Sequence, residues 1–167
     1  MRYPKITIYT FVVNILLLTL MVPGGPIETR SFANIDPVIV MGFNVFLTLL
    51  TIISVVSVYF MYKKQRWAYQ VTGVLGFAFM LVFILDLAKI FPVSRDPMEM
   101  PLFIFECVSL LFGAIVMWLS YKTISVTEKA YWVGQTVIPA WAIFVMIGLL
   151  LLGICVVYFA THFALQM

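Results

Sequence analysis

The chain has 167 residues, of which 64% are hydrophobic and only 10% are charged, and its formal net charge is +3. Soluble domains are about 45–50% apolar and about 25% charged, so this composition excludes a water-soluble fold and indicates a protein embedded in the lipid bilayer. No run of like charges would suit nucleic acid. The two cysteines lack CxxC spacing, which excludes a disulfide framework and a redox or zinc-ribbon motif.

Charged residues divide the chain into five apolar stretches, each close to the roughly 20 residues that a spanning helix needs. We therefore predict an all-α integral membrane protein, a single domain over residues 1–167 formed by a bundle of five transmembrane helices. The first stretch follows basic residues, as in a signal peptide, but no small-residue cleavage site follows it. We expect it to be retained, and its cleavage is the alternative. The predicted spans are 6–22, 38–62, 67–91, 101–121 and 137–160.

The distribution of basic residues predicts the orientation. With five spans, the N-terminus and the second and fourth connections share one side, which carries seven of the ten Lys and Arg residues. Because Lys and Arg concentrate in cytoplasmic loops, we predict a cytoplasmic N-terminus and an outside C-terminus, in the plasma (inner) membrane. The seven are Arg2, Lys5, Lys63, Lys64, Arg66, Lys122 and Lys129, and the other three are Arg30, Lys89 and Arg95.

Two acids lie within predicted spans on either side of one short loop. Helices joined by so short a loop are antiparallel neighbours, which would place Asp86 and Glu106 at a similar depth near the outer end. If Glu106 lay outside the membrane, the span left over residues 107–121 would measure only about 22 Å, against a hydrocarbon core of about 30 Å. Its helical neighbours Ser109 and Gly113 are small, which favours packing of this face against other helices.

Asn44 lies at a comparable depth in the second span, so Asn44, Asp86 and Glu106 predict a polar layer open to the outside. These three are the candidate ligand-binding residues. An acid within the membrane suggests a functional site, here a binding pocket, a proton site or a cation site. The alternative is a hydrogen-bonded structural contact between helices, with Lys89 or Arg95 as the counter-ion. Lys89 follows Asp86 by three residues and can pair with it along the helix.

Two connections carry further expectations. The outer segment 23–37 is the longest predicted connection outside, and it is long enough to fold over the mouth of the bundle. Its Pro and Gly content favours turns rather than a helix. On the inner side, Lys63, Lys64 and Arg66 are candidates for holding the head groups of anionic lipids. The alternative is that these charges only set the orientation.

The hairpin from residue 81 to residue 121, with Asp86 before its loop and Glu106 after it, resembles that of the emopamil-binding family. The resemblance implies a sterol-sized pocket lined by membrane acids. Only one predicted span follows the hairpin, too few to complete that domain, and no membrane-embedded histidine accompanies the acids.

The function is inferred mainly from missing motifs. The sequence has no nucleotide, metal or haem motif, and its lone histidine, His162, cannot form a bis-histidine haem site. We therefore predict no catalytic residue, metal or cofactor. The first hypothesis is a non-enzymatic accessory or structural subunit of a membrane assembly, whose partners are membrane lipids, other membrane subunits or copies of itself, but no nucleic acid. The alternative is a lipid or small-amphiphile binding protein, transporter or isomerase with an outer-leaflet acidic pocket formed by Glu106 and Asp86.

Overall fold

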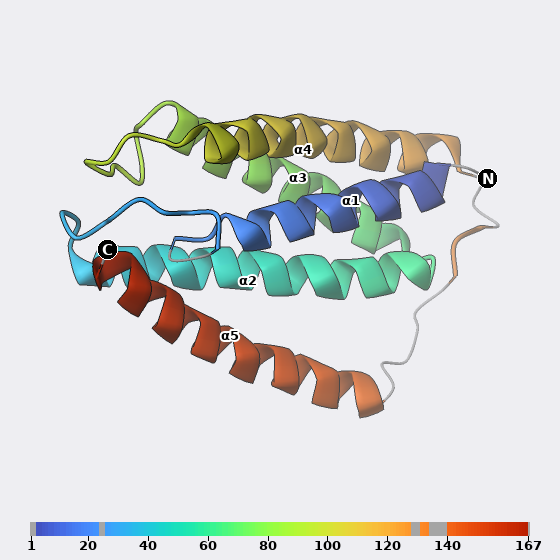
Figure 1. The fold of residues 1–167 in the computed structure, drawn as a ribbon. Coiled ribbons are helices and arrows are strands. Elements are labelled where there is room, and N and C mark those ends of the chain that lie inside the picture. The colour runs from blue at the N-terminus through green and yellow to red at the C-terminus, as the bar shows by residue number, and fades with distance from the viewer. Residues whose placement is uncertain (1–2, 24–25, 128–130, 134–139, 167) are drawn as a thin grey trace.

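The computed structural model describes residues 3–23, 26–127, 131–133 and 140–166. Within these residues the chain is all α, as predicted, and five helices are long and apolar enough to cross a membrane. Successive helices run in opposite directions, as the colours in Figure 1 show. The helices are α1 (Tyr3–Leu20), α2 (Pro37–Tyr62), α3 (Arg66–Leu87), α4 (Met100–Val126) and α5 (Ala140–Gln166).

Some helix ends differ from the predicted spans, because the spans were bounded by charged residues and a charged residue need not mark the end of a helix. Helix α3 ends at Leu87 rather than at residue 91, because Lys89 adopts a positive φ of 54° that no helix continues. Helix α4 continues past Lys122 to Val126, since a charge marks the edge of the apolar core without breaking the helical backbone. The first residues of the predicted fifth span, 137–139, lie outside the described residues, and α5 continues to Gln166.

Local sequence signals explain how α2 begins and how it joins α3. Asp36 caps α2, because its side chain accepts a hydrogen bond of 2.8 Å from the backbone N–H of Val38. Pro37 follows at the first helical position, where its missing N–H removes no helical hydrogen bond. At the other end Lys64 takes a positive φ of 58°, which turns the chain sharply into α3.

Helices α1 to α4 pack as one four-helix unit. Helices α3 and α4 come closest where Gly76 meets Gly113: a Cβ atom added to Gly113 would lie 2.7 Å from Met80 Cγ and 3.1 Å from the Gly76 carbonyl oxygen. Helix α1 covers this pair, with the rings of Phe11 and Phe79 6.0 Å apart. Small residues therefore set the spacing in the unit, as is usual where helices associate within lipid.

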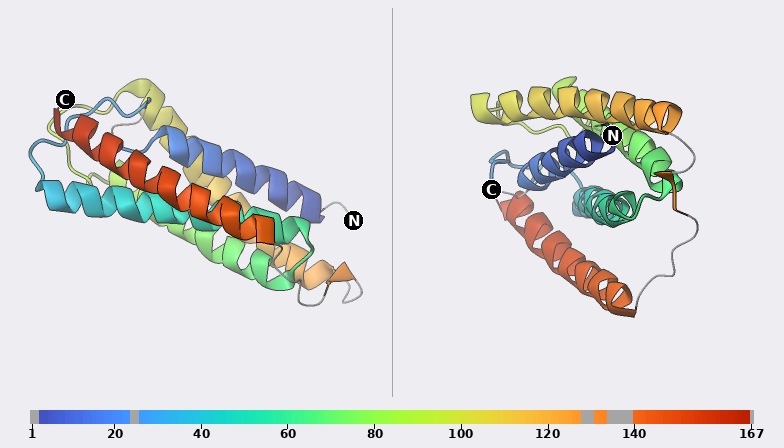
Figure 2. Two further views of the ribbon diagram at one scale, coloured as in Figure 1. Left: turned by 90° about the horizontal axis from the view of Figure 1, so that it is seen from below. Right: turned by 90° about the vertical axis from the view of Figure 1, so that its right-hand side faces the viewer.

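Helix α5 lies at the periphery of the bundle. Among the described helices only α2 packs against it, near Gly153, where an added Cβ would lie 2.9 Å from Thr48 Cγ2. From this contact the two helices diverge toward the N-terminal end of α5 (Figures 1 and 2). Only 11% of the α5 span is buried within the protein, against 28–39% for the other four spans.

Candidate functional site

The connection between α1 and α2 folds back over the end of the four-helix unit, as its length predicted. Two charged side chains in it, Glu28 and Arg30, are 2% and 5% exposed. The α3–α4 connection holds it in place: the Ser31 N–H donates to Asp96 Oδ2 at 2.8 Å, and the Ser94 hydroxyl donates to the Ser31 carbonyl at 2.6 Å. The two connections together cover the end of the bundle at which the predicted acid pair lies.

Arg30 is the centre of a buried ion-pair network. Its guanidinium donates to both oxygens of Glu28, through Nε at 2.8 Å and Nη2 at 2.6 Å. It also donates to both oxygens of Asp86, through Nη1 at 3.0 Å and Nη2 at 2.7 Å. Glu106 is the third acid, with Oε1 3.8 Å from Nη2. We call Glu28, Arg30, Asp86 and Glu106 the acid–arginine cluster.

The counter-ion of the membrane acids therefore differs from the expected one. The sequence pointed to Lys89 or Arg95, but the structure places Arg30 against Asp86, and neither of the other two forms an ion pair with the acids among the described residues. Lys89 is exposed because the chain has left the helix by that point, so the three-residue spacing no longer places it over Asp86. Burial lowers the pKa of the Arg30 guanidinium, but the hydrogen bonds to Glu28 and Asp86 outweigh burial and raise its pKa above the ordinary value.

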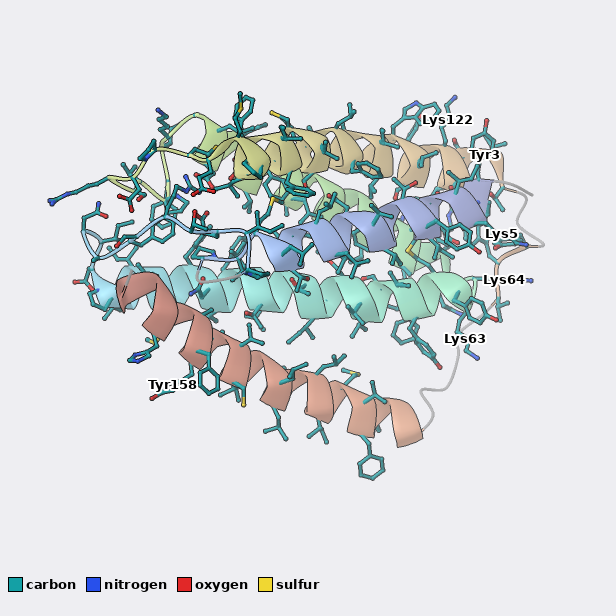
Figure 3. All side chains as sticks on the ribbon, viewed as in Figure 1. Tyr3, Lys5, Lys63, Lys64, Lys122 and Tyr158 are labelled. Carbon is teal, nitrogen blue, oxygen red and sulfur yellow. The ribbon has the colours of Figure 1, made fainter. Side chains whose placement is uncertain are left out.

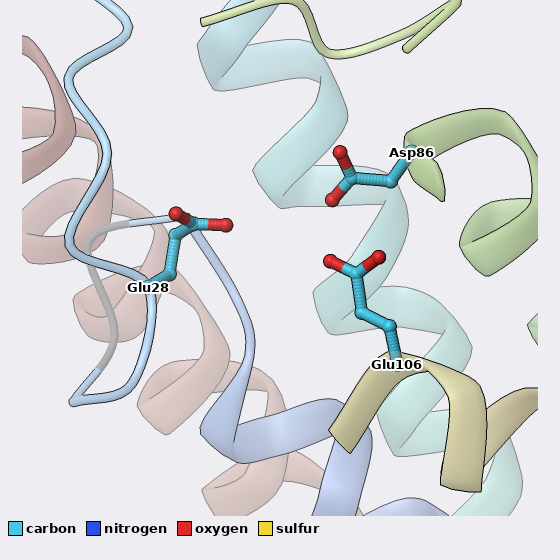
Figure 4. Close-up of side chains that lie close together, drawn as sticks. All are labelled: Glu28, Asp86 and Glu106. Carbon is cyan, nitrogen blue, oxygen red and sulfur yellow. The ribbon is translucent and has the colours of Figure 1, made fainter. Parts of the chain in front are cut away.

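The three acids of the cluster face a common space. One carboxylate oxygen from each lies within 4.8 Å of the others, and Figure 4 shows the three side chains converging from α3, α4 and the α1–α2 connection. The space is a cavity of about 20 Å³ bordered by these acids and by apolar side chains. Glu106 is only 1% exposed, and its Oε2 receives no hydrogen bond from the described residues.

Asn44 does not join this cluster. Its Nδ2 donates to Thr161 Oγ1 at 3.0 Å, which links α2 to α5, and its Oδ1 has no partner among the described residues. The predicted polar layer is thus divided: Asp86 and Glu106 meet, whereas Asn44 faces another helix. A shared depth could be predicted from the spans, but the direction in which each residue faces depends on how the helices rotate against one another.

Sequence reasoning missed two members of the cluster, Glu28 and Arg30. Both lie in a connection whose Pro and Gly content predicted exposed turns, and hydropathy gives no sign that a loop charge is buried. One signal was available. Buried acids need a compensating cation, and the outer side offers only Arg30, Lys89 and Arg95.

The predicted head-group residues lie at the opposite end of the bundle from the cluster. Lys63, Lys64 and Lys5 are exposed there, and Lys122 is half-buried at the same end (Figure 3). The Lys64 ammonium lies 5.1 Å from the centre of the Tyr131 ring, within cation–π range. Arg66 is also exposed at the start of α3. The grouping of these cations at one end agrees with a ring of basic residues at a membrane surface.

Comparison with known proteins places the cluster within a family. Residues 4–133 match the family model described as domain of unknown function DUF8051, which covers more than three quarters of the chain. This chain belongs to the DUF8051 family. The matched region holds the whole acid–arginine cluster and ends before α5. No curated protein and no solved structure matches this DUF8051 protein. The chain is thus a multi-pass membrane protein with a domain of unknown function.

Proposed function

We propose that this DUF8051 protein is a non-enzymatic accessory subunit of an assembly in the plasma (inner) membrane. In this proposal a transmembrane helix of another membrane protein packs between α2 and α5. The observation that carries it is the position of α5, which is long enough to span the membrane but buries little of its surface within its own chain. The family match ends at residue 133, before α5 begins.

The space between α2 and α5 is the proposed site for the partner helix. It is an open cavity of about 520 Å³ with an almost entirely apolar lining, to which Leu150 and Ile154 of α5 contribute. Hydrophobicity alone does not drive helices together in lipid, so close packing around small residues must. Gly153 is the small residue of α5 in this lining, and it already lies close to Thr48 of α2.

The acid–arginine cluster supports a structural role for the four-helix unit. Arg30 joins the α1–α2 connection to α3 through Asp86 and draws on all four oxygens of Glu28 and Asp86. The cavity beside Glu106, at about 20 Å³, is far too small for an amphiphile such as a sterol. In this role the cluster holds the mouth of the unit closed while α5 offers the surface for a partner.

The test is native mass spectrometry of the tagged protein extracted gently from its own membranes. The groove variant is Leu150→Ala/Ile154→Ala, and the matched control is Ile104→Ala/Leu111→Ala, which removes the same side chains from an exposed face of α4. We expect a complex of fixed stoichiometry that the groove variant loses and the control keeps. A monomer, or a complex that both variants retain equally, would refute the proposal. A homo-oligomer lost in the groove variant would identify a second copy as the occupant instead.

A second candidate is the binding of a lipid or small amphiphile at Asp86 and Glu106, as a binding protein, transporter or isomerase. One observation favours it: Glu106 Oε2 is buried and has no hydrogen-bond partner among the described residues, so the acids are not fully used within that part of the chain. A ligand would have to displace the α1–α2 connection and Arg30. In the same spectra, a small molecule of fixed mass that Glu106→Gln loses would support this candidate, and its absence from the wild type would count against it.

We also propose that the basic end of the bundle contacts anionic lipids. Lys63, Lys64 and Arg66 are exposed there and together present three positive charges over a short connection. Replacing all three by Gln should lower the amount of anionic lipid that stays bound after gentle extraction. If the variant and the wild type retained equal amounts of anionic lipid, these charges would serve only to set the orientation of the protein in the membrane.

A further inference from the structure

The acid–arginine cluster contains more negative than positive charge. Three carboxylates face one guanidinium, so two negative charges are unbalanced when all four groups are ionised. All four residues are buried. Unbalanced charge away from water is strongly unfavourable, so the cluster requires two further positive charges from protons or from a bound cation.

The carboxylates keep the capacity to bind a cation while Arg30 stays in place. Arg30 occupies one position on each oxygen of Glu28 and Asp86, and each carboxylate oxygen can accept in two directions. Glu106 Oε2 is buried and receives no hydrogen bond from the described residues, and the Glu106 side chain borders the same cavity as the other two acids (Figure 4). The cavity of about 20 Å³ has room for one particle the size of a water molecule.

We propose that this cavity binds one divalent cation of the calcium class, held by Glu28, Asp86 and Glu106. Every titratable group bordering the cavity is a carboxylate, and hard cations prefer such oxygen ligands. Two oxygens bound to one Ca²⁺ at 2.3–2.6 Å are separated by at most about 5 Å, whereas Mg²⁺ at 2.0–2.1 Å limits the separation to about 4.2 Å. The three carboxylate oxygens lie within 4.8 Å of one another, a separation that Ca²⁺ can span. Ca²⁺ also tolerates irregular coordination, whereas Mg²⁺ requires a near-ideal octahedron.

The cation completes the closure of the bundle mouth. It connects α3, α4 and the α1–α2 connection through one centre and supplies the two charges that Arg30 leaves unbalanced. The rival source of charge is protons, since Asp86 and Glu106 face each other closely enough to share a hydrogen bond when one is protonated. This inference goes beyond the accessory role and does not depend on it.

The experiment uses the full chain, depleted of metal with a chelator and placed in nanodiscs of zwitterionic lipid, which bind little Ca²⁺ themselves. Thermal unfolding and calorimetry follow titration with CaCl₂, MgCl₂ or NaCl. The test variant is Glu106→Gln, which preserves the side-chain shape and removes no hydrogen bond from Arg30, so it should fold. The matched control is Glu99→Gln, the same change at an exposed acid just before α4.

We expect one Ca²⁺ per chain and a saturable rise of several degrees in the Tm of the wild type and of Glu99→Gln. Glu106→Gln should bind Ca²⁺ at least ten-fold more weakly, and Mg²⁺ and Na⁺ should have much smaller effects on all three proteins. A wild type that Ca²⁺ neither binds nor stabilises would overturn the proposal and assign the missing charge to protons. Equal Ca²⁺ affinity in wild type and Glu106→Gln would overturn it as well. If Glu106→Gln fails to fold, the number of Ca²⁺ ions bound per wild-type chain still tests the proposal.

Discussion

The four-helix unit and α5 are equally suited to lipid, but they are held in the protein in different ways. Helices α1 to α4 are joined by contacts that only specific residues can make, such as the Gly76–Gly113 approach and the bonds of Arg30. Helix α5 packs against α2 alone among the described helices, closely at Gly153 and with one side-chain hydrogen bond, from Asn44 to Thr161. Hydropathy thus determines whether a helix enters the membrane, and polar pairs with small residues determine which helices it stays beside.

The difference also separates two kinds of surface. In the four-helix unit a continuous face of α4 is buried, from Glu106 through Ser109 and Gly113 to Thr123, whose hydroxyl lies 2.9 Å from that of Thr7. In α5 most of the described side chains are exposed. A helix with so much exposed surface has room for a second neighbour, which is why we propose that α5 contacts the partner.

The largest expected effect comes from Arg30→Met, which leaves three buried acids without their cation. Breaking a buried ion pair by removing one partner typically costs 3–5 kcal/mol, so we expect a loss of about that size in the free energy of unfolding. Unfolding can be followed by tryptophan fluorescence in mixed micelles. The control is Arg95→Met, an exposed cation in the α3–α4 connection. Equal stability of the two variants would show that the cluster does not hold the unit together.

Gly113→Leu should cause a smaller loss in the free energy of unfolding. The new side chain would meet Met80 and the backbone of Gly76, and overpacking of this kind costs about 1–3 kcal/mol. The matched control is Gly148→Leu, since that position has open space around it and should change stability by less than about 0.5 kcal/mol. A similar loss in both variants would mean that α5 is packed as tightly as the four-helix unit, contrary to the comparison.

The hydrogen bond between Asn44 and Thr161 should contribute still less to the free energy of unfolding. A double-mutant cycle with Asn44→Ala and Thr161→Ala should give a coupling free energy of about 0.6 kcal/mol, the average for side-chain hydrogen bonds between membrane helices. The cycle uses the same unfolding measurement. A coupling of about 2 kcal/mol or more would place α5 among the firmly held helices, and no coupling would leave Gly153 as its one specific attachment.

Removal of α5 should have the smallest effect on the cluster. In a chain that ends at residue 139, Arg30→Met should lower the free energy of unfolding by the same amount as in the full chain, within about 0.3–0.5 kcal/mol. The reason is that the effects of changes at distant, independent sites are additive. The readout is the change in unfolding free energy that the Arg30→Met substitution causes in each of the two chain lengths. A loss that depends on α5 would show that the two regions are coupled.

The amino-acid sequence is sufficient to predict five membrane-spanning helices and the meeting of the acids of α3 and α4 near one end. Both follow from local properties: apolar length sets a span, and a short loop makes its two helices neighbours. The length of the α1–α2 connection showed that it could fold over the bundle mouth, which the structure confirms. The prediction of the helix ends was weaker. Lys122 lies on a helix that continues beyond the apolar core, whereas α3 ends before Lys89, where the backbone takes a positive φ.

Three features emerge only when the helices are packed together: Arg30 pairs with the acids, Asn44 faces α5, and α5 packs against α2 alone among the described helices. Each of these depends on rotation and contact between segments far apart in the chain. In lipid the hydrophobic effect does not favour one helix pair over another, so the pattern of apolar residues does not predict which helices pack together. The helix pairs are determined by specific contacts, such as one guanidinium bound to two carboxylates or two glycines that let backbones approach closely. These contacts depend on the tertiary structure.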